Sequence, residues 1–436
     1  MLIQKNPAFF KQRRENLTKR PEAEGAAFLF GAAPEYLRNN DVHHAYRQDS
    51  TFYYFSGFDE PESYLLILPK KTVMFVRKRD ALKEMWEGER YGIEGALSVF
   101  GVDEAYAYDE FEAKMPELLK GIESLYYRAN VIETEDRKVF SILEALRRSY
   151  GRSGRGLLSI KDPSDLVGEL RLRKSSEEIE FMRKACLYTA NAHKAAMIET
   201  RPGMNEFQVE AMIDYSFRKQ GCQRLGYGSI VAGGKNATCL HYRANNEALR
   251  DGDLLLIDAG GEFNYYTSDI TRTFPIGKTF SKAQAKIYDL VLKAQVSCIG
   301  LAKPGTTLVQ IHQNASEILT DGMLQLGFLK GSRDALIKSS EFRKYYPHGT
   351  GHWLGMDVHD AGLYLTNGEP RRLEKGMMFT IEPGFYVQPN DKEAPAEFRD
   401  IGIRIEDDIL ITDTGCEVMT AGVPKNRDEI EALRTG

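Results

Sequence analysis

Four carboxylates and one histidine in the carboxyl-terminal half of the chain carry the strongest chemical signal in this sequence. They are Asp258, Asp269, His352, Glu382 and Glu406. Each stands in a segment typical of a buried strand or a tight turn, such as LLLIDAG or FTIEPG. A buried carboxylate must be paired, protonated or metal-bound, because an isolated buried charge is too unfavourable. Four carboxylates brought together need about four positive charges, which two divalent cations supply and one arginine does not.

The segment DGDLLLIDAGGEFNYYTSDITRTFPIG predicts a β-hairpin that carries two of these carboxylates. We expect Gly260 and Gly261 to start the reversal, with apolar strands on either side. Asp258 ends one strand and Asp269 lies on the other, so both side chains can reach one spot on one face. A turn or capping role is the alternative for either aspartate alone, but the apolar run before Asp258 is typical of a buried strand.

Three of the eight histidines fall within the glycine-rich segment PHGTGHWLGMDVHD. They are His348, His352 and His359. The glycines between them exclude a regular helix and allow close approach of the backbone. A single histidine here would more often be a core residue. Three beside small residues favour a site, because neutral imidazole is the commonest side-chain ligand of transition metals.

Two glutamates complete the set, each within an apolar, strand-like segment. Glu382, in GMMFTIEPGFYV, has a salt bridge as its alternative role. Glu406, in IGIRIEDDILI, is expected to share a strand face with Arg404, and a plain ion pair between these two is the open alternative. Asp407 and Asp408 are expected to face solvent or to form a turn.

The helices and strands that must position these residues fall into two parts. Residues 1–172 alternate strand-like runs (AAFLFGA, TFYYFSGF, SYLLILP, TVMFVRK) with helical segments such as KVFSILEALRRSY. A capping signal at Ser175 or Ser176 begins a long helix that we expect to reach Glu199. Because 436 residues are too many for one ordinary core, we predict two domains, residues 1–172 and 173–436.

Composition excludes several classes of protein. The net charge is −5, with acidic and basic residues mixed, which argues against a nucleic-acid surface. No apolar run approaches the ~20 residues that span a bilayer. The start, MLIQKNPAFFKQRRENL, lacks the apolar core of a signal peptide. Five widely spaced cysteines without a C-x-x-C pair are interpreted as reduced thiols of a cytoplasmic protein.

The motifs around these residues resemble a known family. LHYRANNEALRDGDLLLIDAGGEFNYYTSDITRTFPIG, HGTGHWLGMDVHD, MMFTIEPGFYV and FRDIGIRIEDDILIT occur in the order and spacing of the "pita-bread" metallopeptidases. RQDSTFYYFSGFDEPE is similar to the amino-terminal domain of the aminopeptidase P (Xaa-Pro aminopeptidase) branch. The resemblance implies an α/β amino-terminal domain followed by an α+β catalytic domain with a curved antiparallel sheet flanked by helices.

The resemblance also implies the metal site. Asp258 would chelate one divalent ion, Asp269 and Glu406 would bridge two, and His352 and Glu382 would complete the second. Oxygen-rich ligation with one imidazole suits manganese, with cobalt, iron or zinc as alternatives. A hydroxide between the two ions would attack the bond that precedes proline in an N-terminal Xaa-Pro pair.

Further roles follow from the same resemblance. Glu382 would accept the water proton and pass it to the proline nitrogen, which cannot leave unprotonated. His359 and His241 would hydrogen-bond the tetrahedral intermediate and the substrate.

The resemblance also implies the residues of the pocket. His348 and Arg404 would line it, and Tyr227 and Trp86 are weaker candidates for its wall. An ordinary packed aromatic is the alternative for Trp86. Arg152, in the loop GRSGRG, would reach the site of a neighbouring subunit, with a solvated loop as the alternative.

Three other functions compete with this interpretation. A prolidase, which cuts only Xaa-Pro dipeptides, shares the metals and the fold. A catalytically inactive binding module of the same fold is disfavoured, because all five ligands are present. Creatine amidinohydrolase shares the fold without relying on this metal set. The expected partners are peptides with proline in the second position, with no nucleic acid and no membrane, and the chain is expected to form a dimer or tetramer.

Overall fold

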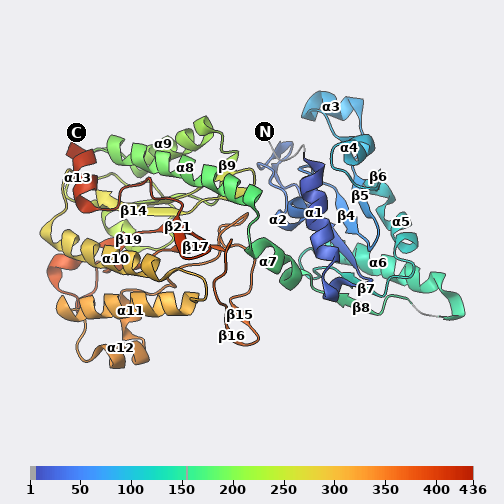
Figure 1. The fold of residues 1–436 in the computed structure, drawn as a ribbon. Helices are drawn as coiled ribbons and strands as arrows, with labels where there is room; N and C mark the ends of the chain where they lie inside the picture. Colours follow the sequence, from blue (N-terminus) through green and yellow to red (C-terminus); the bar gives the residue numbers. More distant parts are fainter. Residues whose placement is uncertain (1–5, 154–155, 436) are drawn as a thin grey trace. The chain divides into compact units, whose positions relative to one another are not determined.

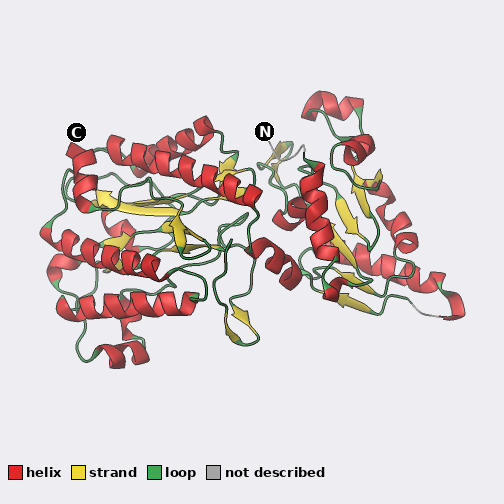
Figure 2. Cartoon of the chain, viewed as in Figure 1, coloured by secondary structure: helices red, strands yellow, loops and turns green. Residues whose placement is uncertain are grey.

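The computed structural model describes residues 6–153 and 156–435. The chain divides into two compact units between Leu170 and Arg171, within helix α7 (Ser164–Leu172). Both units mix helices and strands (Figure 2). Within the described ranges, no helix combines the length and the apolar character needed to cross a membrane.

The amino-terminal unit is built on one mixed sheet in the order β6-β5-β4-β1-β7-β8. The pairs β1–β4 and β4–β5 are antiparallel, and the outer pairs are parallel. Its strands are β1 (Ala27–Gly31), β4 (Tyr64–Ile67), β5 (Thr72–Val76), β6 (Glu104–Ala107), β7 (Ser124–Tyr126) and β8 (Ser159–Lys161), and a separate hairpin joins β2 (Leu37–Asn39) to β3 (Val42–His43). Its helices besides α7 are α1 (Pro7–Thr18), α2 (Ser50–Ser56), α3 (Ala81–Glu87), α4 (Gly92–Ser98), α5 (Phe111–Leu118) and α6 (Glu133–Ser149).

One strand prediction in this unit is wrong. The run TFYYFSGF forms helix α2 (Ser50–Ser56) rather than a strand. Asp49 caps its first turn by accepting a hydrogen bond from the backbone N–H of Phe52, and Gly57 ends it in the left-handed conformation. Almost every side chain of the helix is buried. An apolar run without polar interruptions fits a fully buried helix as well as a strand.

The carboxyl-terminal unit places antiparallel strand pairs between two pairs of helices. Helices α8 and α9 lie on one side of the strands, and α10 and α11 lie on the other (Figure 1). The helices are α8 (Ser176–Glu199), α9 (Glu206–Gln220), α10 (Lys282–Leu301), α11 (Leu308–Gln325), α12 (Arg333–Ser339) and α13 (Arg427–Thr435). Small sheets join β10-β11-β14, β13-β12-β9, β17-β20-β21, β18-β19 and β15-β16. Their strands are β9 (Arg224–Leu225), β10 (Ile230–Gly233), β11 (Leu254–Ala259), β12 (Gly261–Phe263), β13 (Tyr266–Thr267), β14 (Ile270–Pro275), β15 (Leu365–Thr366), β16 (Glu369–Pro370), β17 (Met378–Ile381), β18 (Gly384–Tyr386), β19 (Gly402–Arg404), β20 (Asp407–Ile411) and β21 (Cys416–Val418).

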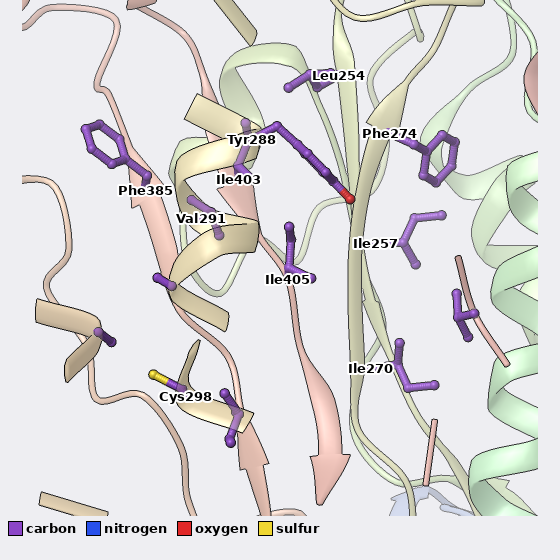
Figure 3. Packing of buried hydrophobic residues seen from close by; sticks show 14 of the residues in the cluster. Leu254, Ile257, Ile270, Phe274, Tyr288, Val291, Cys298, Phe385, Ile403 and Ile405 are labelled. Atoms are coloured by element: carbon purple, nitrogen blue, oxygen red, sulfur yellow. The ribbon is translucent and has the colours of Figure 1, made fainter. Parts of the chain in front are cut away.

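The core of this unit fixes the strands that carry the candidate site. Tyr288 and Val291 of α10 and Ile403 of β19 belong to one buried cluster (Figure 3). Ile257 of β11 and Phe274 of β14 belong to the same buried cluster. Burying each such side chain contributes about 1.5–3 kcal/mol. The strand ends beside this core are therefore held firmly. The predicted combination of an α/β unit and a helix-flanked antiparallel unit is confirmed.

The predicted hairpin is present, but its reversal lies further along the chain. Strand β11 pairs with β14, with Asp258 opposite Thr271. The left-handed turn falls at Asn264 and Tyr265, not at Gly260 and Gly261. Gly260 is instead a place of close approach, because a side chain there would collide with the backbone of the returning strand.

Candidate metal centre

The predicted ligands stand where strands end or break. Asp258 is the last residue but one of β11, and Asp269 lies between β13 and β14. Glu382 separates β17 from β18, and Glu406 separates β19 from β20. At Asp269, Glu382 and Glu406 the predicted continuous strand is therefore interrupted, whereas Asp258 stays within β11. One ligand atom each from Asp269, His352 and Glu406 lie within 4.8 Å of one another.

Asp258 joins this group through shared partners. The Tyr227 hydroxyl lies 2.7 Å from Asp258 Oδ1 and also contacts Asp269. On its other side, Asp258 Oδ2 accepts a hydrogen bond of 2.5 Å from Arg404 Nη2. The ion pair of Arg404 is thus with Asp258, whereas the sequence offered Glu406 as its partner.

His352 connects the remaining carboxylates. Its Nε2 lies 3.4 Å from Asp269 Oδ2 and 3.5 Å from Glu382 Oε1. Its Nδ1 lies 3.1 Å from the carbonyl oxygen of Trp353 and donates to it. This arrangement fixes the ring and turns Nε2 towards the carboxylates, as expected of a metal-ligating histidine. Without a metal ion, the carboxylates outweigh burial and raise the pKa of His352 to about 9.

The carboxylates repel one another strongly. Burial raises the pKa of Glu382 to about 7, and repulsion from Asp269 and Asp258 adds to this effect. Burial and the same two neighbours, together with Glu382, raise the pKa of Glu406 well above its usual range. Arg404 is the one arginine or lysine that pairs directly with these carboxylates among the described residues. This surplus of negative charge, with imidazole Nε2 facing it, fits divalent cations.

The other candidate histidines surround this cluster. The ring of His359 lies 4.1 Å from that of His352, centroid to centroid. His348 Nδ1 donates to the carbonyl oxygen of Gly349 at 2.7 Å, and its Nε2 lies 2.9 Å from the Tyr386 hydroxyl. Burial, followed by Arg404, lowers the pKa of His348 to about 3, so its ring is neutral.

His241 lies in an exposed turn. Burial lowers the pKa values of His348 and His359, and the proximity of His241 is a smaller cause in each case. The structure therefore brings His241, His348, His352 and His359 into one neighbourhood from two distant segments.

Tyr386 and Thr271 are site residues that sequence reasoning missed. The Tyr386 hydroxyl accepts a hydrogen bond of 3.1 Å from Arg404 Nη1 and donates to the neutral His348. Thr271 Oγ1 accepts from Arg404 Nε at 2.9 Å and donates to Glu406 Oε2 at 2.7 Å. The signal for Tyr386 was its place four residues after Glu382 in the same apolar segment.

Asp407 and Asp408 contradict the prediction that they face solvent or form a turn. Both lie in β20 and are fully buried. Asp407 forms an ion pair of 2.7 Å with the buried Arg272. Asp408 accepts hydrogen bonds from Ser268 Oγ at 2.7 Å and from the backbone N–H of Asp269 at 3.0 Å. Both therefore support the residues around the cluster.

Two candidates lie outside this unit. Trp86 is on α3 of the amino-terminal unit with 84% of its surface exposed, so the alternative of an ordinary packed aromatic is wrong for this chain. Arg152 is exposed in a short 3₁₀ turn, Gly151–Ser153.

Comparison with known proteins identifies the class. Residues 180–413 match the description "Metallopeptidase family M24", and residues 10–126 match "Aminopeptidase P, N-terminal domain". The chain belongs to metallopeptidase family M24, which confirms the predicted family and the prediction of a metallopeptidase.

Its relatives are similar over most of their length. The chain is 42% identical to an Xaa-Pro aminopeptidase of Escherichia coli (strain K12), covering 97% of each chain. It is 35% identical to Xaa-Pro aminopeptidase 3 of Homo sapiens over 92% of this chain and 79% of that one. Among solved structures, aminopeptidase PepP of Pseudomonas aeruginosa gives a TM-score of 0.95 at 41% identity, covering 98% of each chain. Zn-substituted Escherichia coli aminopeptidase P in complex with product gives 0.94 at 41% identity, covering 99% and 98%.

Proposed function

We propose that this protein is an Xaa-Pro aminopeptidase, which releases the N-terminal residue from peptides with proline in the second position. The observation that carries the proposal is the cluster of Asp269, Glu382 and Glu406 around His352, which Asp258 joins through the Tyr227 hydroxyl. Similarity to Xaa-Pro aminopeptidases over most of their length supports the substrate class. Residues 1–172 are assigned to the amino-terminal domain and 173–436 to the catalytic domain, which the division of the chain near Leu170 supports.

Two divalent cations would be held by the five predicted ligands. They are Asp258, Asp269, His352, Glu382 and Glu406. Manganese is proposed, because oxygen donors outnumber nitrogen in this set. When bound, such cations polarise the substrate carbonyl group and lower the pKa of water, so that a nucleophile is available near neutral pH.

The side chains of the chain itself perform the remaining steps. Glu382 accepts the proton of the attacking water and delivers it to the proline nitrogen. His359 and His241 donate hydrogen bonds to the substrate and to the oxygen that develops charge. Both histidines flank the carboxylate cluster, which supports these roles.

The pocket beside these groups is formed by His348, Arg404 and Tyr227, joined to the cluster by the hydrogen bonds described above. Arg404 keeps one carboxylate oriented while Tyr386 connects it to His348. Trp86 remains a proposed residue of the pocket wall, and Arg152 is proposed to reach the site of a neighbouring subunit. A cytoplasmic homo-oligomer, dimeric or tetrameric, is proposed as the working form.

The decisive experiment compares an Xaa-Pro-Yaa tripeptide with an Xaa-Pro dipeptide, with and without added manganese, alongside metal analysis of the purified protein. We expect release of the N-terminal residue from the tripeptide, faster with manganese, and about two metal ions per chain. Rapid cleavage of the dipeptide with an inert tripeptide would make the protein a prolidase instead. Chelation with EDTA should abolish either activity.

A further inference from the structure

A second buried carboxylate, remote from the metal cluster, remains unexplained by the proposed chemistry. Glu206, the first residue of helix α9, is fully buried. In the described part of the chain it forms no ion pair with a lysine or arginine. A buried carboxylate without a counter-ion must be satisfied by hydrogen bonds.

Four donors surround the carboxylate of Glu206. Oε1 accepts from the backbone N–H of Gly233 at 2.8 Å and from Asn236 Nδ2 at 2.9 Å. Oε2 accepts from the Tyr242 hydroxyl at 2.9 Å and from the backbone N–H of Glu247 at 2.9 Å. A carboxylate offers about four lone-pair positions, and these donors fill all of them.

All four donors belong to one stretch of chain that contains His241. Glu206 binds this stretch on both sides of His241, before it at Gly233 and after it at Tyr242 and Glu247. The backbone of Glu206 also donates to the carbonyl oxygen of Glu247 at 3.0 Å.

Asn245 reinforces the same stretch from within. Its side chain accepts from the backbone N–H of Val231 at 3.0 Å and donates to the carbonyl oxygen of Ser229 at 2.8 Å. Its backbone is left-handed, with φ of +43°. His241 itself remains exposed between these anchors. Its place beside the cluster therefore depends on bonds made by its neighbours.

We propose that Glu206 is the positioning residue for His241, holding the ring at the substrate through four hydrogen bonds to the segment that carries it. The inference rests on the proposed function, in which His241 contacts the substrate. A misplacement of about 1 Å can lower a rate by about 100-fold, so the anchoring matters for catalysis.

The Glu206→Gln variant tests the proposal sharply. Glutamine keeps the size of the side chain but turns an NH₂ group towards two donors, whichever way the amide lies. We expect kcat for an Xaa-Pro-Yaa tripeptide to fall about 10–100-fold with metal content unchanged. Tyr242→Phe removes a single bond and should give a smaller fall in the same direction. Glu210→Gln, one turn further along α9, is the matched control and should behave as the wild type.

A double-mutant cycle separates positioning from general structural damage. If Glu206 acts through His241, then Glu206→Gln combined with His241→Ala should have the kcat of His241→Ala alone, within about twofold. Independent, multiplying losses in the double variant would overturn the proposal.

Trypsin supplies a readout that does not depend on activity. Arg243 is exposed in the anchored segment, and release of the anchor should speed cleavage after Arg243 by about tenfold or more. Equal cleavage of Glu206→Gln and wild type would overturn the anchoring. A wild-type enzyme inert towards Xaa-Pro-Yaa would overturn the proposed function, while faster cleavage after Arg243 in Glu206→Gln would still support the anchor.

Discussion

The backbone N–H of Asp269 donates a hydrogen bond of 3.0 Å to the carboxylate of Asp408. Ser268 Oγ donates to the same oxygen at 2.7 Å, and the Cys186 thiol lies 3.3 Å from it. Asp408 therefore fixes the chain at the break between β13 and β14, where Asp269 faces the carboxylate cluster. It supports this proposed metal ligand through the backbone of Asp269.

Asp408→Asn should weaken metal binding without removing any ligand. The amide oxygen can replace Oδ2, but the NH₂ group then replaces Oδ1 and faces the backbone N–H of Asp269, 3.3 Å from that position, so Asp269 loses its fixed place. Loss of a supporting group of this kind typically lowers metal affinity about 10–100-fold. Competition with a metal-binding dye measures the change. Asp413→Asn, at an exposed aspartate that pairs with Lys375, is the control and should leave affinity unchanged.

Asp269→Ala should abolish peptidase activity and reduce metal content. The residue is one of the proposed ligands of the divalent cations, and its loss would leave the metal site incomplete. The fold should survive, because removing one carboxylate relieves repulsion on Glu406 and Glu382. Elemental analysis and circular dichroism of the purified variant measure the two effects. A fully active Asp269→Ala protein would refute the site. We expect Glu382→Ala to lose activity and metal as Asp269→Ala does.

His193 should make the metal-free protein sensitive to mild acid. It is fully buried in α8, its Nε2 lies 3.1 Å from the carbonyl oxygen of Ala259, and its Nδ1 has no hydrogen-bond partner. Burial lowers the pKa of His193 to about 4, against about 6.5 in the unfolded chain. Its contribution to stability is therefore complete above about pH 6.5 and is lost as the pH falls towards 4.

The loss amounts to about 3 kcal/mol in the free energy of unfolding. We would measure this loss by urea unfolding in EDTA at pH 8 and at pH 4.5. The wild type would be compared with His193→Gln. Glutamine keeps a donor for Ala259 but does not titrate, so the variant should lose less stability between the two pH values. Equal losses in both proteins would exclude His193 as the cause.

Elements with strong local signals could be predicted from the sequence. Helix α8 begins where Ser175 and Glu178 form a reciprocal capping box and ends at Glu199, and α9 stops at the left-handed Gly221. In both cases, residues close in sequence satisfy the free backbone groups at a helix terminus. That terminus can therefore be predicted without knowledge of distant contacts.

The strand breaks at the site and the burial of Asp408 depended on contacts between distant segments. Apolar character around Glu382 and Glu406 indicated strands, but the breaks at these residues arise only when the two segments pair with each other. Asp408 was expected to face solvent, because the sequence could not show that Ser268 and Asp269 would satisfy it inside the core. Buried polar networks are specified by tertiary structure and leave no periodic pattern.

The segment that carries His352 and His359 is anchored by a buried charge cluster. Arg171 Nη2 donates to Asp360 and, at 2.7 Å, to Asp357, while Lys174 Nζ lies 3.1 Å from Asp360. Burial alone would raise the pKa of Asp360, but attraction to Arg171 and Lys174 outweighs it and holds that pKa below its usual value. Asp360 follows His359 directly, so its ion pairs fix the ring at the site.

Asp360→Ala should therefore destabilise the protein and also lower its rate of peptide hydrolysis. The substitution leaves the buried Lys174 without its counter-charge and leaves Arg171 with Asp357 alone, which costs about 3–5 kcal/mol. Urea unfolding at pH 7 measures this loss. Asp357→Ala is the matched control, because Asp357 pairs with the same arginine but its side chain is 41% exposed. This variant should lose no more than about 1 kcal/mol.

The difference in the free energy of unfolding between the wild type and Asp360→Ala should depend on pH. It is fully present above about pH 4 and should shrink as the pH falls through the lowered pKa of Asp360, because a protonated carboxyl group no longer balances the two cations. A difference that stays constant down to pH 3 would show that packing, rather than charge, holds this segment.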